Sequence, residues 1–109
     1  MRIWDLPPVK LCNKHLLGEH AELHAIWNIL AHNKRGYSHH PETIRWAGKL
    51  KVLYSVHDNI AKEMLKRGFM HKSKLDFRFA RGSSRQSQFV DSIQQQIRLL
   101  KHKKCGCRV

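Results

Sequence analysis

Apolar side chains recur three and four residues apart along most of the chain, which is the spacing of one face of a helix. This pattern predicts three main helices, over roughly residues 9–33, 41–67 and 89–104. Pro41 suits the first position of the second helix, and Gly48 within that helix is a candidate kink. Alternating apolar and polar residues, the pattern of a half-buried strand, are nearly absent. We therefore expect an all-α fold.

Two segments lack this periodicity. Residues 1–8 are expected to form an extended N-terminal arm that ends at Pro7-Pro8. Residues 69–88 contain a Gly-Ser-Ser turn and are predicted to be a basic loop. The charged residues of this loop are Lys72, Lys74, Asp76, Arg78, Arg81 and Arg85. We predict a single compact domain, residues 1–109, in which three helices are joined by long basic connections.

The charge balance of the chain narrows its function. The 109 residues include 21 Lys and Arg against 8 Asp and Glu, a formal net charge of +13. Such a surface attracts polyanions at long range, and nucleic acid is the usual partner. No apolar run could span a membrane, no secretory signal is evident, and 3 cysteines argue against a disulfide scaffold. We expect a cytoplasmic, nucleoid-associated monomer that binds nucleic acid and no membrane.

The first predicted helix carries acidic residues where apolar ones are expected. At about 100° per residue, Glu19 falls inside the apolar arc, while His15 and Glu22 lie at its edge. A carboxylate beside a buried stripe is costly unless it is paired or serves a pocket. Two interpretations remain open: acids that are paired with some of the many cations, or an acidic site within a strongly basic surface.

The amino terminus is a second candidate for chemistry. An α-amino group has a pKa of about 7.7–8, against about 10.4 for lysine, so a useful fraction is a free nucleophile at neutral pH. Because Arg2 is bulky, Met1 is expected to be retained. The amine matters only if the arm folds back beside Glu22.

The metal-ligand patterns in the sequence are incomplete. His20 and His24 have the i, i+4 spacing of a helical metal pair, but no third ligand is evident and Glu22 is out of register for HExxH. Cys105-Gly106-Cys107 is at best half of a metal site, and a disulfide across one residue would be strained. We therefore expect no metal and no cofactor.

Several stretches of the chain together resemble a known family. They are Met1-Arg2-Ile3, His15-Leu16-Leu17-Gly18-Glu19-His20-Ala21-Glu22-Leu23, and residues 41–60 followed by Leu65-Lys66-Arg67-Gly68-Phe69. In these stretches the sequence resembles the pyrimidine-dimer DNA glycosylases of the phage T4 endonuclease V type, small all-α enzymes that also cleave at abasic sites. The ending, from Phe89 to Cys107, resembles the short bacterial and archaeal branch of that family.

The resemblance implies an activity and roles for individual residues. It implies a DNA repair enzyme that binds damaged double-stranded DNA. Such an enzyme removes pyrimidine dimers through an imine of the N-terminal α-amino group, followed by β-elimination at the abasic site. The nucleophile would be Met1 and the catalytic acid Glu22, while Arg2 and His15 would contact the damaged strand. Further DNA contacts are expected from Lys14, Glu19, Lys72, Lys74, Arg81 and Arg85.

The chain departs from the phage pattern at three places. Met1 stands where the mature phage enzyme exposes a threonine, and Ala21 and His24 stand where arginines surround the catalytic glutamate. The aromatic-rich tail of the phage enzyme is absent. The means of recognising the lesion is therefore expected to differ.

Two other functions fit parts of the sequence. A non-enzymatic, basic, helical nucleic-acid-binding protein explains the charge but not the acids of the first helix. A metal-dependent nuclease that uses His20, His24 and the acids predicts that a chelator abolishes cleavage. Borohydride trapping on abasic-site DNA separates an imine-forming enzyme from a binding protein, because only the enzyme gives a covalent adduct.

Overall fold

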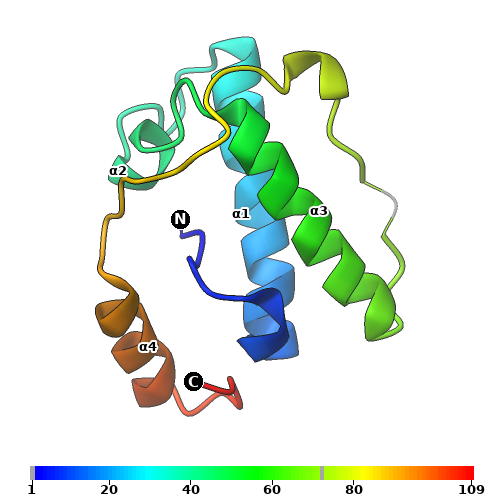
Figure 1. The fold of residues 1–109 in the computed structure, drawn as a ribbon, viewed down its shortest axis with the longest axis vertical. Coiled ribbons are helices and arrows are strands. Elements are labelled where there is room, and N and C mark those ends of the chain that lie inside the picture. Colours follow the sequence, from blue (N-terminus) through cyan, green and yellow to red (C-terminus); the bar gives the residue numbers. More distant parts are fainter. Residues whose placement is uncertain (1, 72) are drawn as a thin grey trace.

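Two long helices, α1 and α3, pack against each other at the centre of the fold (Figure 1). The computed structural model describes residues 2–71 and 73–109, so Met1 and Lys72 lie outside the described residues. In chain order the elements are the 3-10 turn η1 (Pro8–Lys10), α1 (Asn13–His32), α2 (Pro41–Ile44), α3 (Leu50–Lys66), the 3-10 turn η2 (Phe77–Phe79) and α4 (Ile93–His102). Neither described range contains a strand, which confirms the all-α class with three main helices.

The periodicity predicted that the first helix begins near residue 9, but helix α1 begins at Asn13. Pro7-Pro8 leads into η1, and Leu11 then enters the core in an extended conformation before the helix starts. The apolar pattern of this stretch therefore reflects burial of an irregular segment. The helix ends where Asn33 adopts a left-handed conformation with φ of 52°.

The predicted second helix, residues 41–67, is broken and not merely kinked. Helix α2 ends at Ile44, a turn follows, and α3 starts at Leu50. Gly48 lies in this turn with φ of +72°, a left-handed conformation that glycine adopts without strain. The glycine that was expected to bend one helix therefore separates two.

The basic loop closes over this break. Ser83 N donates to Gly48 O, and Lys51 N, in the first turn of α3, donates to Arg81 O, both at 2.9 Å. The N–H groups at the start of a helix have no partner within the helix, so the Arg81 carbonyl stabilises the start of α3. Gly82 has φ of +92°, and a Cβ on it would collide with the Gly48 carbonyl. The crossing therefore requires glycine there.

Helix α4 is shorter than the predicted helix over residues 89–104. Its N-cap is Ser92, whose hydroxyl accepts from Gln95 N at 3.2 Å, while the Gln95 side chain accepts from Ser92 N at 2.9 Å. This capping box fixes the start of the helix at Ile93. Phe89 lies before the cap and remains exposed.

The buried apolar side chains form one cluster that includes the arm and the last helix. Its members are Ile3, Trp4, Leu11, Leu16, Leu23, Ile26, Trp27, Trp46, Leu53, Ile60, Met64, Leu75 and Leu100. Ile3 and Trp4 of the arm are nearly fully buried in it. Among the described helices, none combines the length and apolar character needed to cross a bilayer.

Candidate active site

The N-terminal arm runs between α1, α2 and α4, and hydrogen bonds hold its backbone there (Figure 1). Three consecutive N–H groups each donate to a side chain from a different helix. The pairs are Ile3 to Glu42 Oε1 (3.2 Å), Trp4 to Glu19 Oε1 (2.8 Å) and Asp5 to Gln96 Oε1 (2.8 Å). The three accepting side chains are buried. The arm therefore folds back against the first helix.

A buried arginine holds the other side of the arm. Arg45, just after α2, is 4% exposed. Its Nη2 lies 2.7 Å from Glu42 Oε1 and 3.1 Å from Asp5 Oδ2, and donates to Ile3 O at 3.0 Å. Because Arg45 meets two carboxylates and a carbonyl, its own buried positive charge is compensated. We call the four side chains that hold the arm the arm clamp: Glu19, Glu42, Arg45 and Gln96.

Glu19 is the buried acid that the helix pattern singles out. It is 3% exposed, its Oε1 accepts from Trp4 N, and its Oε2 has no hydrogen-bond partner. Burial raises the pKa of Glu19 to about 8, against the lowering effect of the Trp4 N–H, and the nearby Asp5 and Glu42 carboxylates add to the increase. Glu19 is therefore mostly protonated at pH 7, and it forms no ion pair with a cation in the two described ranges.

A cleft of about 450 Å³ opens where the arm meets α1. Its lining residues are Arg2, Trp4, Lys14, His15, Gly18, Glu19 and Glu22. Glu22 is half-buried and makes no hydrogen bond or ion pair with any other described residue, so its carboxylate can meet a ligand. A Cβ on Gly18 would have no atom within 4 Å, so this wall of the cleft is open. The cleft thus brings together Glu22 and four predicted DNA contacts, while Met1 lies outside the described residues.

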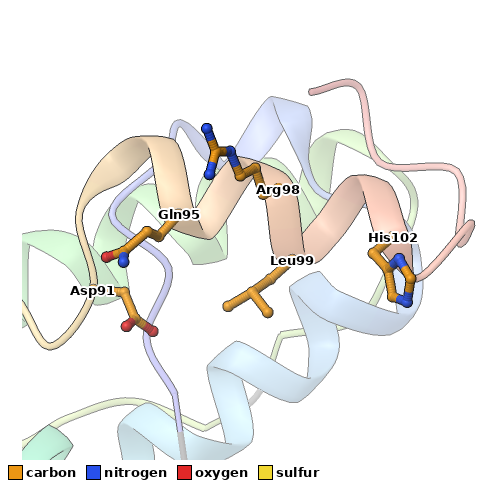
Figure 2. Close-up of a pocket in the computed structure, with 5 residues that line it drawn as sticks. All are labelled: Asp91, Gln95, Arg98, Leu99 and His102. Carbon is orange, nitrogen blue, oxygen red and sulfur yellow. The ribbon is translucent and has the colours of Figure 1, made fainter.

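Arg2 connects this cleft to a second hollow, along α4. Its Nη1 lies 2.7 Å from Asp91 Oδ2, and its guanidinium lies 4.9 Å from the centre of the Trp4 ring. The second hollow, of about 420 Å³, is lined by Asp91, Gln95, Arg98, Leu99 and His102. Figure 2 shows Asp91 and Leu99 directed to one side of α4 and Arg98 directed to the other. The Arg2–Asp91 ion pair therefore joins one residue that lines the cleft to one residue that lines the hollow along α4.

The remaining predicted DNA contacts do not line the cleft. Lys74, Arg81 and Arg85 are exposed on the segment that leads from α3 to α4. Lys72 lies outside the described residues. The loop cations are thus available to a polyanion, but separately from the residues around Glu22.

Two clusters of metal-ligand side chains go beyond what the sequence predicts. The residues are Cys12, His15, Cys105 and Cys107 in one cluster, and His20, His24, His57 and His71 in the other. Each cluster contains one of the incomplete patterns seen in the sequence, but the completing residues come from distant segments. Burial, together with the neighbouring imidazoles, lowers the pKa of His20 and His57 to about 4, so both rings are neutral at pH 7.

Comparison with known proteins identifies the family of the chain. A family model described as pyrimidine dimer DNA glycosylase matches residues 1–77, a range that includes every residue lining the cleft. Neither the curated proteins nor the solved structures provide a match to the chain. Because the matched range covers well over half of the sequence, the chain belongs to the pyrimidine dimer DNA glycosylase family.

Proposed function

We propose that this protein is a DNA repair glycosylase with abasic-site lyase activity on pyrimidine dimers, and that the α-amino group of Met1 is its nucleophile. The observation that carries the proposal is the cleft in which Arg2 and Trp4 of the arm meet Glu22 of α1. Met1 precedes Arg2 in the chain, one residue from this lining. Membership of the pyrimidine dimer DNA glycosylase family supports the same chemistry.

Binding to double-stranded DNA begins with the phosphates. A net charge of +13 favours this step, and Lys72, Lys74, Arg81 and Arg85 supply cations outside the cleft. Affinity falls as salt rises, because neutralised phosphates release their counterions. The duplex then bends and a nucleotide leaves the stack, which costs least where stacking is already damaged. Arg2, Lys14 and His15 line the cleft that receives the damaged strand.

The chemistry proceeds through an imine. The free amine attacks C1′ of the 5′ sugar of the dimer, and the bond from C1′ to the base breaks with its electron pair leaving on the base. Loss of the amine proton and opening of the sugar ring give the imine. Glu22 holds negative charge beside the developing oxocarbenium and then moves the protons needed for β-elimination, which expels the 3′ phosphate. No step requires a metal ion.

The arm clamp has a positioning role in this mechanism. Glu19, Glu42 and Gln96 accept the three backbone N–H groups that follow Arg2, so the start of the arm is tied to three helices. A displacement of about 1 Å at a reacting atom can cost a factor of about 100 in rate. Glu19 is buried, so we assign it to holding the arm and not to direct contact with DNA.

Borohydride trapping tests the proposal directly. The untagged protein is incubated with duplexes that carry one cyclobutane dimer, one abasic site or no damage, and the imine is reduced. We expect a covalent adduct on both damaged duplexes, mapped by mass spectrometry to the N-terminal peptide. An N-terminal Gly-Ser extension abolishes the adduct, while the same extension at the C terminus serves as the control and leaves it.

Each other outcome contradicts a specific part of the proposal. An adduct that survives the N-terminal extension and maps by mass spectrometry to a lysine side chain assigns the nucleophile to that lysine. An adduct on the abasic duplex alone removes the glycosylase step. Tight, salt-dependent DNA binding without any adduct identifies a non-enzymatic nucleic-acid-binding protein, which the charge alone also favours. Size-exclusion chromatography and fractionation of the cells check the further expectation of a monomer associated with the nucleoid.

A further inference from the structure

Three sulfur atoms converge on one ring nitrogen at the start of α1. His15 Nδ1 lies 3.1 Å from Cys12 Sγ, 3.2 Å from Cys105 Sγ and 3.4 Å from Cys107 Sγ. The two C-terminal sulfur atoms are 3.4 Å apart, and all four atoms lie within 4.8 Å of one another. Zinc bonds of about 2.3 Å to sulfur and about 2.0–2.1 Å to nitrogen give a tetrahedron with edges of about 3.5–3.8 Å. The observed separations of 3.1, 3.2, 3.4 and 3.4 Å are a few tenths of an ångström shorter, so a small outward shift of the side chains would accommodate the ion.

Hydrogen bonds or a disulfide explain this cluster poorly. One imidazole nitrogen offers either one N–H or one lone pair, so His15 Nδ1 can engage only one of the three thiols. A disulfide between Cys105 and Cys107 would bridge a single residue, a strained arrangement, and would leave Cys12 unexplained. A cation at the centre engages all four atoms at once.

The backbone around the cluster holds the C-terminal tail against the start of α1. Arg108 N donates to Lys10 O at 2.7 Å, and Cys12 N donates to Cys107 Sγ at 3.1 Å. Gly106, between the two cysteines of the tail, has φ of 93°. Metal ligands are commonly held by hydrogen bonds of this kind from the surrounding backbone. The hydrogen bond from Arg108 to Lys10 therefore joins the tail to the segment before α1 without using a ligand atom of the cluster.

We propose that Cys12, His15, Cys105 and Cys107 bind one zinc ion in a closed, structural site. Three thiolates and one imidazole fill the four positions that structural zinc prefers, so none is left for water or substrate. Binding releases the three thiol protons to solvent and replaces them with the ion. The ion joins the tail to α1 and fixes the ring of His15, which also lines the cleft.

Metal analysis of the untagged full-length protein tests this site. The protein is purified without chelators, and zinc per chain is measured by elemental and native mass spectrometry. The Cys105→Ser/Cys107→Ser variant is expected to contain one equivalent less than the wild type. The control is His39→Gln, on an exposed turn outside both clusters, which keeps the full amount.

A spectroscopic measurement on the wild type keeps the test valid if the cysteine variant does not fold. Cobalt(II) loaded into the wild-type protein is expected to show tetrahedral d–d bands together with a thiolate-to-cobalt charge-transfer band. Cobalt binding without the charge-transfer band overturns the proposal. So does an unchanged zinc content in the cysteine variant, or an intact mass that shows a Cys105–Cys107 disulfide in freshly purified protein.

A different set of contacts carries a second site. The Nε2 atom of His24 lies 3.2 Å from that of His20 and 3.1 Å from that of His57. The Nε2 atom of His71 lies 3.0 Å from that of His20 and 3.3 Å from that of His57. Zn–N bonds of about 2.0–2.1 Å give a tetrahedral edge of about 3.3–3.4 Å. Four nitrogens from α1, α3 and the segment after α3 thus surround one point.

Hydrogen bonds satisfy only part of this ring of four contacts. A neutral imidazole carries one proton, so each Nε2 is either a donor or an acceptor. If two Nε2 atoms are donors and two are acceptors in alternation, only two N–H groups are available for the four Nε2–Nε2 contacts. At most two of these contacts can then be full hydrogen bonds. At about 100° per residue, Glu22 points about 200° away from His20 around α1. The cluster therefore lies on a different face of α1 from Glu22, and it contains no carboxylate.

From these contacts we infer that His20, His24, His57 and His71 bind a second divalent transition-metal ion, with zinc as the expected occupant. The site is closed by four protein ligands and ties α3 and the following segment to α1. The His71→Gln variant is expected to lose one metal equivalent, whereas His39→Gln loses none. Cobalt in the Cys105→Ser/Cys107→Ser variant is expected to give d–d bands without a thiolate charge-transfer band.

Different results overturn the two proposed metal sites. Full metal content in the His71→Gln variant, or no cobalt binding by the cysteine variant when circular dichroism shows a wild-type helical content, overturns the histidine site alone. If the cysteine variant does not fold, the wild-type protein decides the question. The histidine site is then overturned if the wild type contains one zinc per chain and its cobalt-loaded form shows only the spectrum of the thiolate site.

Discussion

The cleft depends on two ranges of the chain that contribute different kinds of residue. Residues 1–77 match the family model, and residues 78–109 lie beyond it. Every residue that lines the cleft belongs to the first range. The second range contributes contacts to the arm: Gln96 accepts from Asp5 N, and Asp91 pairs with Arg2. Its last cysteines lie against His15. The residues that we propose for the chemistry thus belong to the first range, while the contacts that hold the arm come from both.

The family match to residues 1–77 therefore covers only some of the residues on which the site depends. The residues proposed for catalysis can be read from residues 1–77, but the arm is held by side chains from both sides of the boundary. Glu19 and Glu42 belong to the matched range, and Gln96 belongs to the range beyond it. Removal of the cleft carboxylate of Glu22 is therefore expected to remove the reaction. Removal of the supports that come from beyond residue 77 is expected to slow the reaction or weaken the fold.

The largest effect is expected for the carboxylate in the cleft. Glu22→Gln keeps the shape of the side chain but removes its charge and its proton transfer, so adduct formation and strand cleavage are expected to fall by about 10²–10⁴-fold. DNA affinity is expected to stay within a factor of about two, since each step of proton transfer follows binding. Single-turnover rates and a binding titration measure the two effects. The matched control is Glu63→Gln, an acid paired with Arg67 on α3, and an unchanged rate for Glu22→Gln would refute its assigned role.

The next effect concerns stability and belongs to the range beyond the family match. Removing the metal of the cysteine cluster, by Cys105→Ser/Cys107→Ser or by a zinc chelator, is expected to lower Tm by roughly 10 °C. This corresponds to about 2 kcal/mol for a domain of this size. Thermal unfolding followed by circular dichroism measures the change. A Tm that the chelator leaves unchanged in the wild type contradicts a stabilising ion.

The arm clamp allows a direct comparison of the two ranges. Glu19→Leu leaves the N–H of Trp4 without an acceptor, and Gln96→Leu does the same to Asp5. A buried donor without a partner costs about 1–3 kcal/mol. Trp4 is buried and Asp5 is only half-buried, so water can replace the lost acceptor of Asp5 more easily. We expect the Glu19 variant to be the less stable and the slower in trapping; the reverse order would place the main support of the arm beyond the family match.

Much of the fold follows from local pattern, because helix periodicity is local. The positions of α1, α3 and α4 agree with the predicted helices apart from their ends. The break before α3 was not predicted, since it depends on the crossing of Gly48 by Gly82, which are far apart in sequence. Ile44 is exposed, because the broken helix no longer carries one continuous apolar face. Leu65 is exposed because it lies about 100° around α3 from the buried Met64.

The site was predictable to the extent that one helix carries it. Glu19 and Glu22 stand out because they interrupt an apolar face. From the sequence, the return of the arm to that helix was only a condition for a role of the amine, and the structure shows the described part of the arm, from Arg2 onward, beside that helix. Gln96 and Arg45 show no such anomaly, since nothing near them in sequence indicates their partners. The roles of Met1 and Glu22 remain predictions. The metal clusters could be seen only as halves, because His57 and Cys105 reach their partners through the tertiary fold.

A smaller effect is expected at the ion pair that links the two ranges. Arg2→Ala removes a charge from the cleft and is expected to weaken binding to the damaged duplex about tenfold, since a hydrogen bond to a charged group contributes about 1.5–3 kcal/mol. Asp91→Asn removes only the partner, and a partly exposed pair contributes about 0–1 kcal/mol. Binding titrations with damaged and undamaged duplexes measure both. If Arg2→Ala loses helical content in proportion to its loss of binding, Arg2 has a structural role instead.

The smallest effect is expected on the loop that crosses the break before α3. Arg85 is exposed there and does not line the cleft, so Arg85→Ala is expected to weaken binding to damaged and undamaged DNA alike. The slope of log affinity against log salt is expected to fall by about 1, because one phosphate contact is lost. The rate at saturating DNA stays unchanged, since the substituted side chain acts only before the strand enters the cleft. Lys14→Ala, inside the cleft, is the matched comparison and is expected to affect the damaged duplex more. A changed saturating rate for Arg85→Ala would mean that the loop takes part in the reaction, and the division between chemistry before residue 78 and support after it would no longer hold.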